Sequence, residues 1–184
     1  VVGLDIDPDE LGAAPDGAYD ETLARDLCTF TGQGDADLVI CQATLEHVPD
    51  TAGAIRAIAS ILKPGGKALI FAPSRNALFA RLNLLLPQKW KENILYFVYP
   101  VPDVTQHQGF PAHYDKCTPR EIEKLAQENG LEVSERHLFW MSSYFFNLVP
   151  AYVFWRLWQG IFRLVAGPNA AETFAYVLTK QPER

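Results

Sequence analysis

One continuous stretch, residues 37–72, constrains the fold of this 184-residue chain more than any other. It begins with a β-branched apolar run, Asp37 to Cys41, which is typical of a buried strand. From Thr51 to Leu62 the apolar side chains recur at helical spacing, and Pro64-Gly65-Gly66 then ends the helix. Lys67 to Ala72 is apolar again. Two strands joined by a helix predict a βαβ unit, in which the two strands are parallel.

The alternation of strands and helices continues on both sides of this unit. The other predicted strands are residues 1–6, 22–26, 131–138 and 173–179, and another predicted helix begins at Thr118 and ends at Asn129. Thr118 is a candidate N-cap, Pro119 occupies the first helical position, and Gly130 is a typical stop. We therefore expect residues 1–184 to form a single α/β domain with a doubly wound sheet.

The composition excludes several classes of partner and site. With 16 basic and 22 acidic residues the formal net charge is −6, so we expect no nucleic-acid partner. Cys28, Cys41 and Cys117 are far apart and form no CxxC pair, which argues against both a zinc site and a disulfide framework. No basic leader precedes the apolar run at Val1, and we expect a cytoplasmic protein without a metal.

Acidic residues close the first two predicted strands. Ligands of open α/β sheets bind beyond the carboxyl ends of the strands. Asp5 has the position from which a carboxylate accepts both ribose hydroxyls of a nucleoside cofactor, although Asp5 and Asp7 equally fit a turn and a helix cap. Asp26 can accept the exocyclic amine of adenine while Leu27 covers the ring, and it also fits a solvated loop.

The residues around the third strand resemble those of class I S-adenosylmethionine-dependent methyltransferases of the type 11 and 23 kind. The resemblance rests on LEHV at residues 45–48, followed by LKPGG at residues 62–66. GLDIDP and ARDL upstream, and TPREIEKLAQENGLEV and TFAYVLTKQ downstream, occur in the order of that family. The resemblance implies a Rossmann-like sheet of strand order 3-2-1-4-5-7-6 with the last strand antiparallel, and S-adenosyl-L-methionine as the cofactor.

The resemblance also implies a function for particular residues. Asp5 would hold the ribose, Ile6 would lie against the adenine, Asp26 and Leu27 would recognise the adenine edge, and Gln42 and Ala43 would line the methionine end. The implied reaction is methyl transfer to a small-molecule acceptor.

The family's first strand and its GxGxG turn are expected immediately before Val1, so that this chain is N-terminally truncated. Its only methionine, Met141, agrees with this expectation. A helix N-terminus and close backbone at that turn hold the cofactor's carboxylate. We therefore expect the 184-residue chain by itself to bind the cofactor poorly.

Methyl transfer needs no universal catalytic residue, because the sulfonium of the cofactor already activates the methyl group. Where the acceptor atom is a hydroxyl, a base with a pKa near neutrality helps. His47 and His113 are the candidates, with Tyr114 and Asp115 next to the second. His47 also fits a structural histidine at a helix entry that bonds to backbone, which leaves His113 the better candidate for contact with the acceptor.

Two aromatic-rich segments, residues 76–101 and 139–170, do not fit the alternation and are expected to be insertions or a lid. No charged residue occurs between residues 138 and 155, but polar residues and Pro150 interrupt this run. The pattern favours an amphipathic interfacial or lid helix pair over a membrane-spanning helix, with peripheral membrane contact through residues 139–163. Packing on the sheet and a dimer contact are the alternatives. Both segments favour an apolar or lipid-like acceptor.

Two other functions compete with methyl transfer. A nicotinamide-dependent oxidoreductase also places an acid at the end of its second strand. A non-catalytic module can keep the same fold as an interaction surface.

Overall fold

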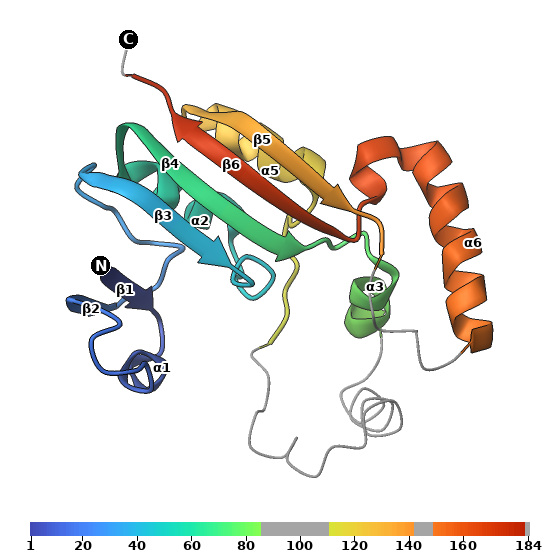
Figure 1. The fold of residues 1–184 in the computed structure, drawn as a ribbon, viewed down its shortest axis with the longest axis horizontal. Helices are drawn as coiled ribbons and strands as arrows, with labels where there is room; N and C mark the ends of the chain where they lie inside the picture. Colours follow the sequence, from blue (N-terminus) through green and yellow to red (C-terminus); the bar gives the residue numbers. More distant parts are fainter. Residues whose placement is uncertain (86–110, 142–148, 183–184) are drawn as a thin grey trace.

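The computed structural model describes residues 1–85, 111–141 and 149–182 (Figure 1). In chain order its elements are β1 (Val2–Asp5), α1 (Pro8–Gly12), β2 (Glu21–Ala24), β3 (Ala36–Gln42), α2 (Thr51–Ile61), β4 (Leu62–Pro73), α3 (Leu78–Leu85), α5 (Pro119–Glu128), β5 (Leu131–Phe139), α6 (Val149–Ala166), the 3-10 turn η1 (Gly167–Ala170) and β6 (Thr173–Lys180). All six strands predicted from the sequence are present.

The strands form two groups with the neighbours that the sequence implies. β1 pairs with β2 in parallel, and the other group has the order β3-β4-β6-β5. β3 and β4 are parallel, whereas β6 is antiparallel to both β4 and β5. Counting β1 as the family's second strand, these groups are 3-2 and 4-5-7-6, and the antiparallel last strand is confirmed. β1 and β3 are not hydrogen-bonded to each other, and the family's order places a strand between them.

Local signals in the sequence explain where the two long sheet-covering helices begin. The Asp50 side chain accepts a hydrogen bond from Gly53 N at 3.1 Å and caps α2, and Thr118 accepts one from Glu121 N at 3.4 Å and caps α5. The prediction that residues 64–66 separate a helix from a strand was wrong in part. Strand pairing begins directly after α2, at Leu62, and the intervening residues form an irregularity within β4 before pairing resumes at Lys67.

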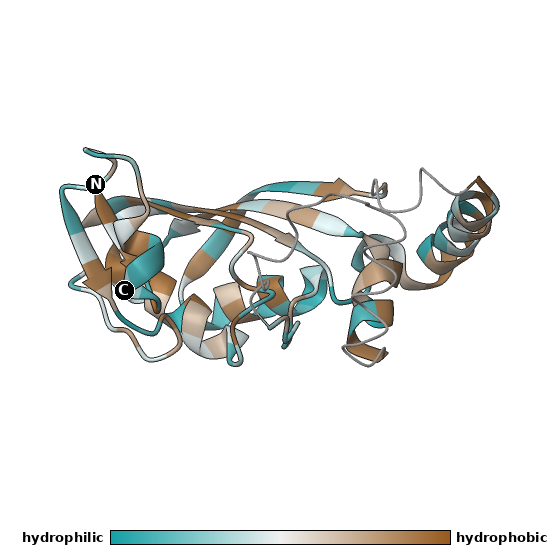
Figure 2. Ribbon diagram, turned by 90° about the horizontal axis from the view of Figure 1, so that it is seen from below, coloured by the Kyte–Doolittle hydropathy of each residue, from teal (hydrophilic) through white to brown (hydrophobic). Residues whose placement is uncertain are grey.

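The core lies between one face of the larger sheet and the helices α2 and α5, which Figure 2 shows on the same side of the strands. Along β4, the buried residues Ala68, Ile70 and Ala72 alternate with the exposed Leu69 and Phe71. No helix in the described part of the chain covers the other face of this sheet near β3 and β4.

α6 stands at the far end of the molecule, beyond the ends of β5 and β6 (Figures 1 and 2). Two buried side chains dock it: Trp155 Nε1 donates to Glu172 Oε1 at 2.6 Å, and Gln159 Nε2 donates to the carbonyl of Ala170 at 2.7 Å. The described part of the aromatic segment 139–170 contains one long helix, and residues 86–110 and 142–148, which include much of both aromatic segments, lie outside the described residues. Among the helices that are described, none is long and apolar enough to cross a membrane.

Candidate functional site

The carboxyl ends of β1 and β2 bring two predicted cofactor residues to one edge of the sheet. Asp5 is paired with Ala24, and its carbonyl accepts a hydrogen bond from Arg25 N at 2.8 Å, so that Asp26 follows at the same edge. Asp7 N donates to Asp5 Oδ1 at 2.9 Å, which agrees with the turn interpretation.

Asp26 has the same local geometry, since Cys28 N donates to its Oδ1 at 2.8 Å. Each of these turns occupies one carboxylate oxygen and fixes the side chain. The second oxygen of Asp5 accepts no hydrogen bond from any residue that the structure describes. The Asp26 carboxylate also contacts the Cys28 thiol, and burial together with this contact raises the pKa of that thiol. At Asp5 the turn and the ligand interpretations are therefore compatible, because one oxygen serves the fold and the other is open.

The other predicted cofactor residues lie at the ends of the same strands. Ile6 is 65% exposed, and Gln42 and Ala43 at the end of β3 are also exposed. Leu27 is half-buried against the edge of the core. These side chains are accessible to a ligand at the carboxyl ends of β1, β2 and β3.

Backbone strain is concentrated near the end of β3. Among the described residues, the non-glycine positions with positive φ are Ala43 at 52°, Tyr114 at 50° and Lys116 at 38°. L-residues rarely adopt this conformation, and such strain tends to gather at functional sites. The family resemblance implies Ala43 for the cofactor site, and Tyr114 is adjacent to the candidate base His113, so the strain coincides with the predicted site.

The loop of residues 111–118 is tied to the turn that follows β3. The carbonyl of Glu46 accepts hydrogen bonds from His113 N at 2.8 Å and Tyr114 N at 2.9 Å. Thr51, which is fully buried, holds the same loop through its backbone N–H to Asp115 Oδ2 at 3.1 Å and its hydroxyl to the Asp115 carbonyl. These contacts position the loop beside His47.

The two candidate histidines meet at this junction in different ways. His47 Nδ1 lies 3.2 Å from the carbonyl oxygen of Pro111. Because a carbonyl only accepts, Nδ1 carries the proton, and Nε2 of the neutral ring is then the acceptor. This backbone contact agrees with a structural histidine, yet it also orients a base. His113 is exposed, and its backbone rather than its ring is held by Glu46.

Sequence reasoning missed Glu46, which it used only as part of the LEHV motif. Its side chain is buried, with Oε1 3.9 Å from His47 Nε2, and Oε2 accepts no hydrogen bond from any described residue. Burial raises the pKa of this carboxyl above its usual range. An acid directly after a strand end, next to a histidine, was the available signal.

Two thiols in this region, those of Cys41 and Cys117, are unreactive. Burial raises the pKa of the Cys41 thiol to about 12 and also raises the pKa of the Cys117 thiol. Cys117 Sγ donates to the carbonyl of Pro73 at 3.3 Å. Both sulfurs therefore stay protonated at neutral pH and act as small core residues rather than as nucleophiles.

Comparison with known proteins gives consistent matches. The sequence profile of a family described as a methyltransferase domain matches residues 1–136. A ubiquinone biosynthesis O-methyltransferase from Aeromonas salmonicida is 30% identical over 142 residues, which cover 73% of this chain and 55% of that protein. A protein of the same name from Marinobacter nauticus is 40% identical over 102 residues, covering 48% and 40%. The chain thus spans about half the length of these relatives, or less.

A solved structure shows the same fold. An S-adenosylmethionine dependent methyltransferase from Mesorhizobium loti superposes with a TM-score of 0.58 at 16% sequence identity, and the match covers 98% of this chain and 80% of that one. At this identity the likeness concerns the fold alone. The matches give no support to the nicotinamide-dependent oxidoreductase that the sequence had left as an alternative.

Proposed function

Because the chain belongs to the methyltransferase domain family, we propose that it binds S-adenosyl-L-methionine and transfers its methyl group to a small-molecule acceptor. The observation that carries the proposal is the pair of strand-end acids, Asp5 and Asp26. Each is fixed by a backbone N–H through one oxygen, and both lie at the edge of the sheet where nucleoside cofactors bind.

The residues at this edge fit the parts of such a cofactor. The open oxygen of Asp5 suits the ribose hydroxyls, and the carboxylate of Asp26 suits the adenine amine. Ile6 and Leu27 offer apolar surface to the adenine ring, and Gln42 and Ala43 lie toward the methionine end. The bound cofactor would supply an activated methyl group, and the protein would supply its position.

A hydroxyl oxygen is the acceptor atom that the relatives favour, since those from Aeromonas salmonicida and Marinobacter nauticus are named O-methyltransferases. Removal of the hydroxyl proton is then the step that the protein assists. We assign this to His47, whose Nδ1–H is held by the Pro111 carbonyl so that Nε2 can accept the proton. Glu46 is the positioning residue, because its carboxyl lies on the Nε2 side of the ring and is favourable to the charged imidazolium.

His113 has a separate place in this proposal. Its backbone is fixed by the Glu46 carbonyl while its ring is exposed, so the ring contacts the acceptor rather than the cofactor. Replacing His113 with Ala lowers turnover more than cofactor affinity, and unchanged turnover removes His113 from the site.

Incubation of the full-length protein with methyl-labelled S-adenosylmethionine and an extract of lipids and small molecules tests the function. We expect the labelled methyl group to enter an acceptor from which neither acid nor base treatment releases it, as is typical of an ether. Asp5→Asn should lose most of this labelling. Asp9→Asn, which changes an exposed acid on α1, is the matched control and keeps the activity. Absence of labelled acceptor with the unaltered protein contradicts the proposal and favours a non-catalytic module.

The exposed face of α6 gives the protein a means of peripheral membrane contact. Its exposed apolar residues are Val149, Val153, Phe154, Leu157, Trp158, Ile161, Leu164 and Val165. At 100° per residue they occupy one half of the helix, opposite or beside the docked Trp155 and Gln159. The charged residues of α6 are Arg156 and Arg163, without any acid, which suits an anionic lipid surface although the whole chain is acidic.

A further inference from the structure

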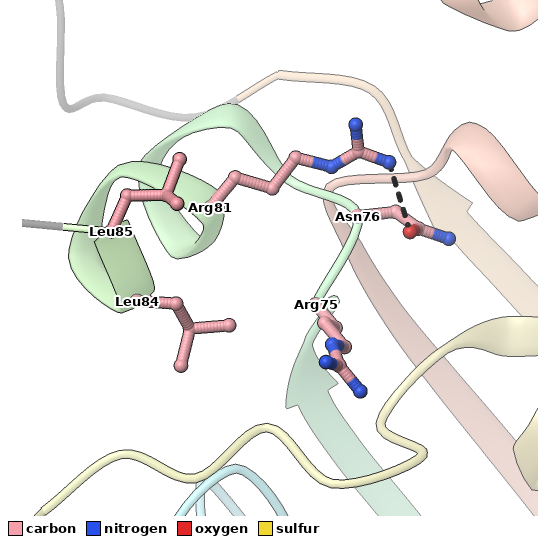
Figure 3. A pocket seen from close by; sticks show the side chains of 5 residues that line it. All are labelled: Arg75, Asn76, Arg81, Leu84 and Leu85. Atoms are coloured by element: carbon pink, nitrogen blue, oxygen red, sulfur yellow. Dashed lines mark hydrogen bonds between the residues drawn. The ribbon is translucent and has the colours of Figure 1, made fainter.

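An open hollow lies beyond the carboxyl end of β4, next to the proposed site. It is lined by Arg75, Asn76, Arg81, Leu84 and Leu85 and has a volume of about 340 Å³ (Figure 3). Arg75 N donates to the carbonyl of Cys117 at 2.7 Å, so one wall of the hollow is joined to the loop that carries His113. Since β4 is the direct neighbour of β3, the hollow opens at the sheet edge where the acceptor must approach.

A chain of contacts holds the hollow in shape. Arg81 reaches from α3 to Asn76 and donates to its Oδ1 at 3.2 Å, as Figure 3 shows. Asn76 Nδ2 in turn donates to the carbonyl of Asn169 at 2.9 Å. The Arg81 guanidinium also lies 4.9 Å from the centre of the Phe162 ring of α6. Arg81 is therefore pre-arranged rather than a freely moving surface side chain.

Among the residues that the structure describes, none neutralises the two arginines of the hollow. No carboxylate among the described residues forms an ion pair with Arg75 or Arg81. Arg75 is exposed and is free to turn its guanidinium to a ligand. Guanidinium groups pair in a planar, two-pronged manner with carboxylates and phosphates. A protein that is acidic overall thus places two arginines, without an ion pair to any described carboxylate, near the proposed cofactor site.

The opposite wall is apolar. Leu84 is 42% exposed and Leu85 is 79% exposed, and both belong to α3 (Figure 3). The hollow has the size of a small-molecule site, for which volumes of roughly 300–1,000 Å³ are usual. Building on the proposed function, we infer that this hollow binds the anionic group of an amphiphilic acceptor, a carboxylate or a phosphate, at Arg75, with the apolar part of the acceptor against Leu84 and Leu85.

Calorimetric titration of the protein with decanoate, decyl phosphate and decanamide tests this inference. The three probes share a chain and differ in the head group, so the first two distinguish a carboxylate from a phosphate ligand. We expect one or both anions to bind and decanamide to bind at least about tenfold more weakly, as the loss of a charged hydrogen bond predicts. Arg75→Gln should abolish the difference in affinity between the anions and the amide, and Arg75→Lys should keep part of it. Arg56→Gln on α2, an equal change of charge at an exposed position, should leave this difference unaltered.

Equal binding of the anions and the amide overturns the inference, and so does equal weakening of anion binding by Arg75→Gln and Arg56→Gln. Cofactor binding is measured in the same samples. Arg75 has no part in holding the cofactor. If Arg75→Gln loses cofactor binding, the variant is misfolded, and thermal unfolding of that variant detects this. Arg75→Lys then decides the test. If the protein binds the cofactor but not the anions, the inference about the hollow is refuted, and the proposed function is unaffected.

Discussion

Glu46 links stability to pH at the scale of a single residue. Burial raises the pKa of this carboxyl in the folded protein, so the folded chain holds the proton more tightly than the unfolded chain. Its contribution to stability is full below the unfolded pKa and is lost as the pH rises through the folded pKa. Replacing Glu46 with Gln removes this loss. We therefore expect the free energy of unfolding of Glu46→Gln, relative to the unaltered protein, to be higher at about pH 8 than at about pH 5.

Urea unfolding of both proteins at the two pH values measures this difference. Glu10→Gln, at an exposed position of α1, serves as the control and should show no such change. A Glu46→Gln difference that is the same at both pH values would show that the carboxyl is not destabilised by its burial.

Ala43 stores strain in the turn after β3. Its φ of 52° costs an L-residue roughly 1–2 kcal/mol, which glycine does not incur. The greater flexibility of glycine in the unfolded chain cancels part of this gain. Ala43→Gly should therefore raise the free energy of unfolding by about 0.5–1 kcal/mol. Ala57→Gly, within α2, should lower it by about 1 kcal/mol or more. If chemical denaturation shows that Ala43→Gly and Ala57→Gly destabilise the protein equally, Ala43 is not strained.

The residues at the site were only partly predictable from the sequence. The positions of Asp5 and Asp26 were predictable, because they depend on the strands alone and strand ends can be recognised from composition. The burial of Glu46 was not, because it depends on the loop of residues 111–118, which joins it from more than sixty positions away. The positive φ of Ala43 was hidden for another reason: glycine or asparagine normally marks such a conformation, and alanine does not.

At the scale of elements, α6 makes a prediction about lipid surfaces. Leu157 is 65% exposed on its apolar face, and its transfer into a lipid interface is worth about 1.5–3 kcal/mol. Leu157→Gln should therefore weaken sedimentation with vesicles of phosphatidylcholine and phosphatidylglycerol by about tenfold or more. The binding should also fall with salt, because Arg156 and Arg163 are the charged groups of this helix.

Leu38→Gln is the matched control, since Leu38 is 55% exposed on β3 and lies outside α6. It should leave sedimentation unaltered. If both variants sediment like the unaltered protein, α6 is not the lipid-binding element. A change in oligomeric state with Leu157→Gln, measured by analytical ultracentrifugation without vesicles, would instead identify the face as a contact between copies of the chain.

Helix and strand positions were predictable where local capping and periodicity agreed. α2 and α5 begin where Asp50 and Thr118 cap them, and β6 follows from its own apolar pattern. The start of β4 was predicted wrongly, because Pro64 and the two glycines after it indicate a break. The pairing of Leu62 with Ala36 on β3 brings those residues into the strand, and no local signal reports a contact made across the sheet.

At the scale of the whole molecule, the strand order was expected only from the resemblance to the methyltransferase family, and the neighbours within the two groups of strands agree with it. The docking of α6 could not be predicted, since it depends on side-chain hydrogen bonds from Trp155 to Glu172 and from Gln159 to Ala170 that no sequence pattern indicates. The proposed cofactor site spans the carboxyl ends of β1, β2 and β3, so its test needs a method that both detects binding and locates it.

Amide chemical shifts of the ¹⁵N-labelled chain, recorded by NMR during titration with S-adenosylmethionine, provide that measurement. The account predicts that the largest changes occur at the three strand ends, at Asp5-Ile6, Asp26-Leu27 and Gln42-Ala43, and that Asp26→Asn reduces them while NAD⁺ does not reproduce them. Changes confined to other parts of the chain, or equal changes with NAD⁺, would contradict the proposed cofactor site.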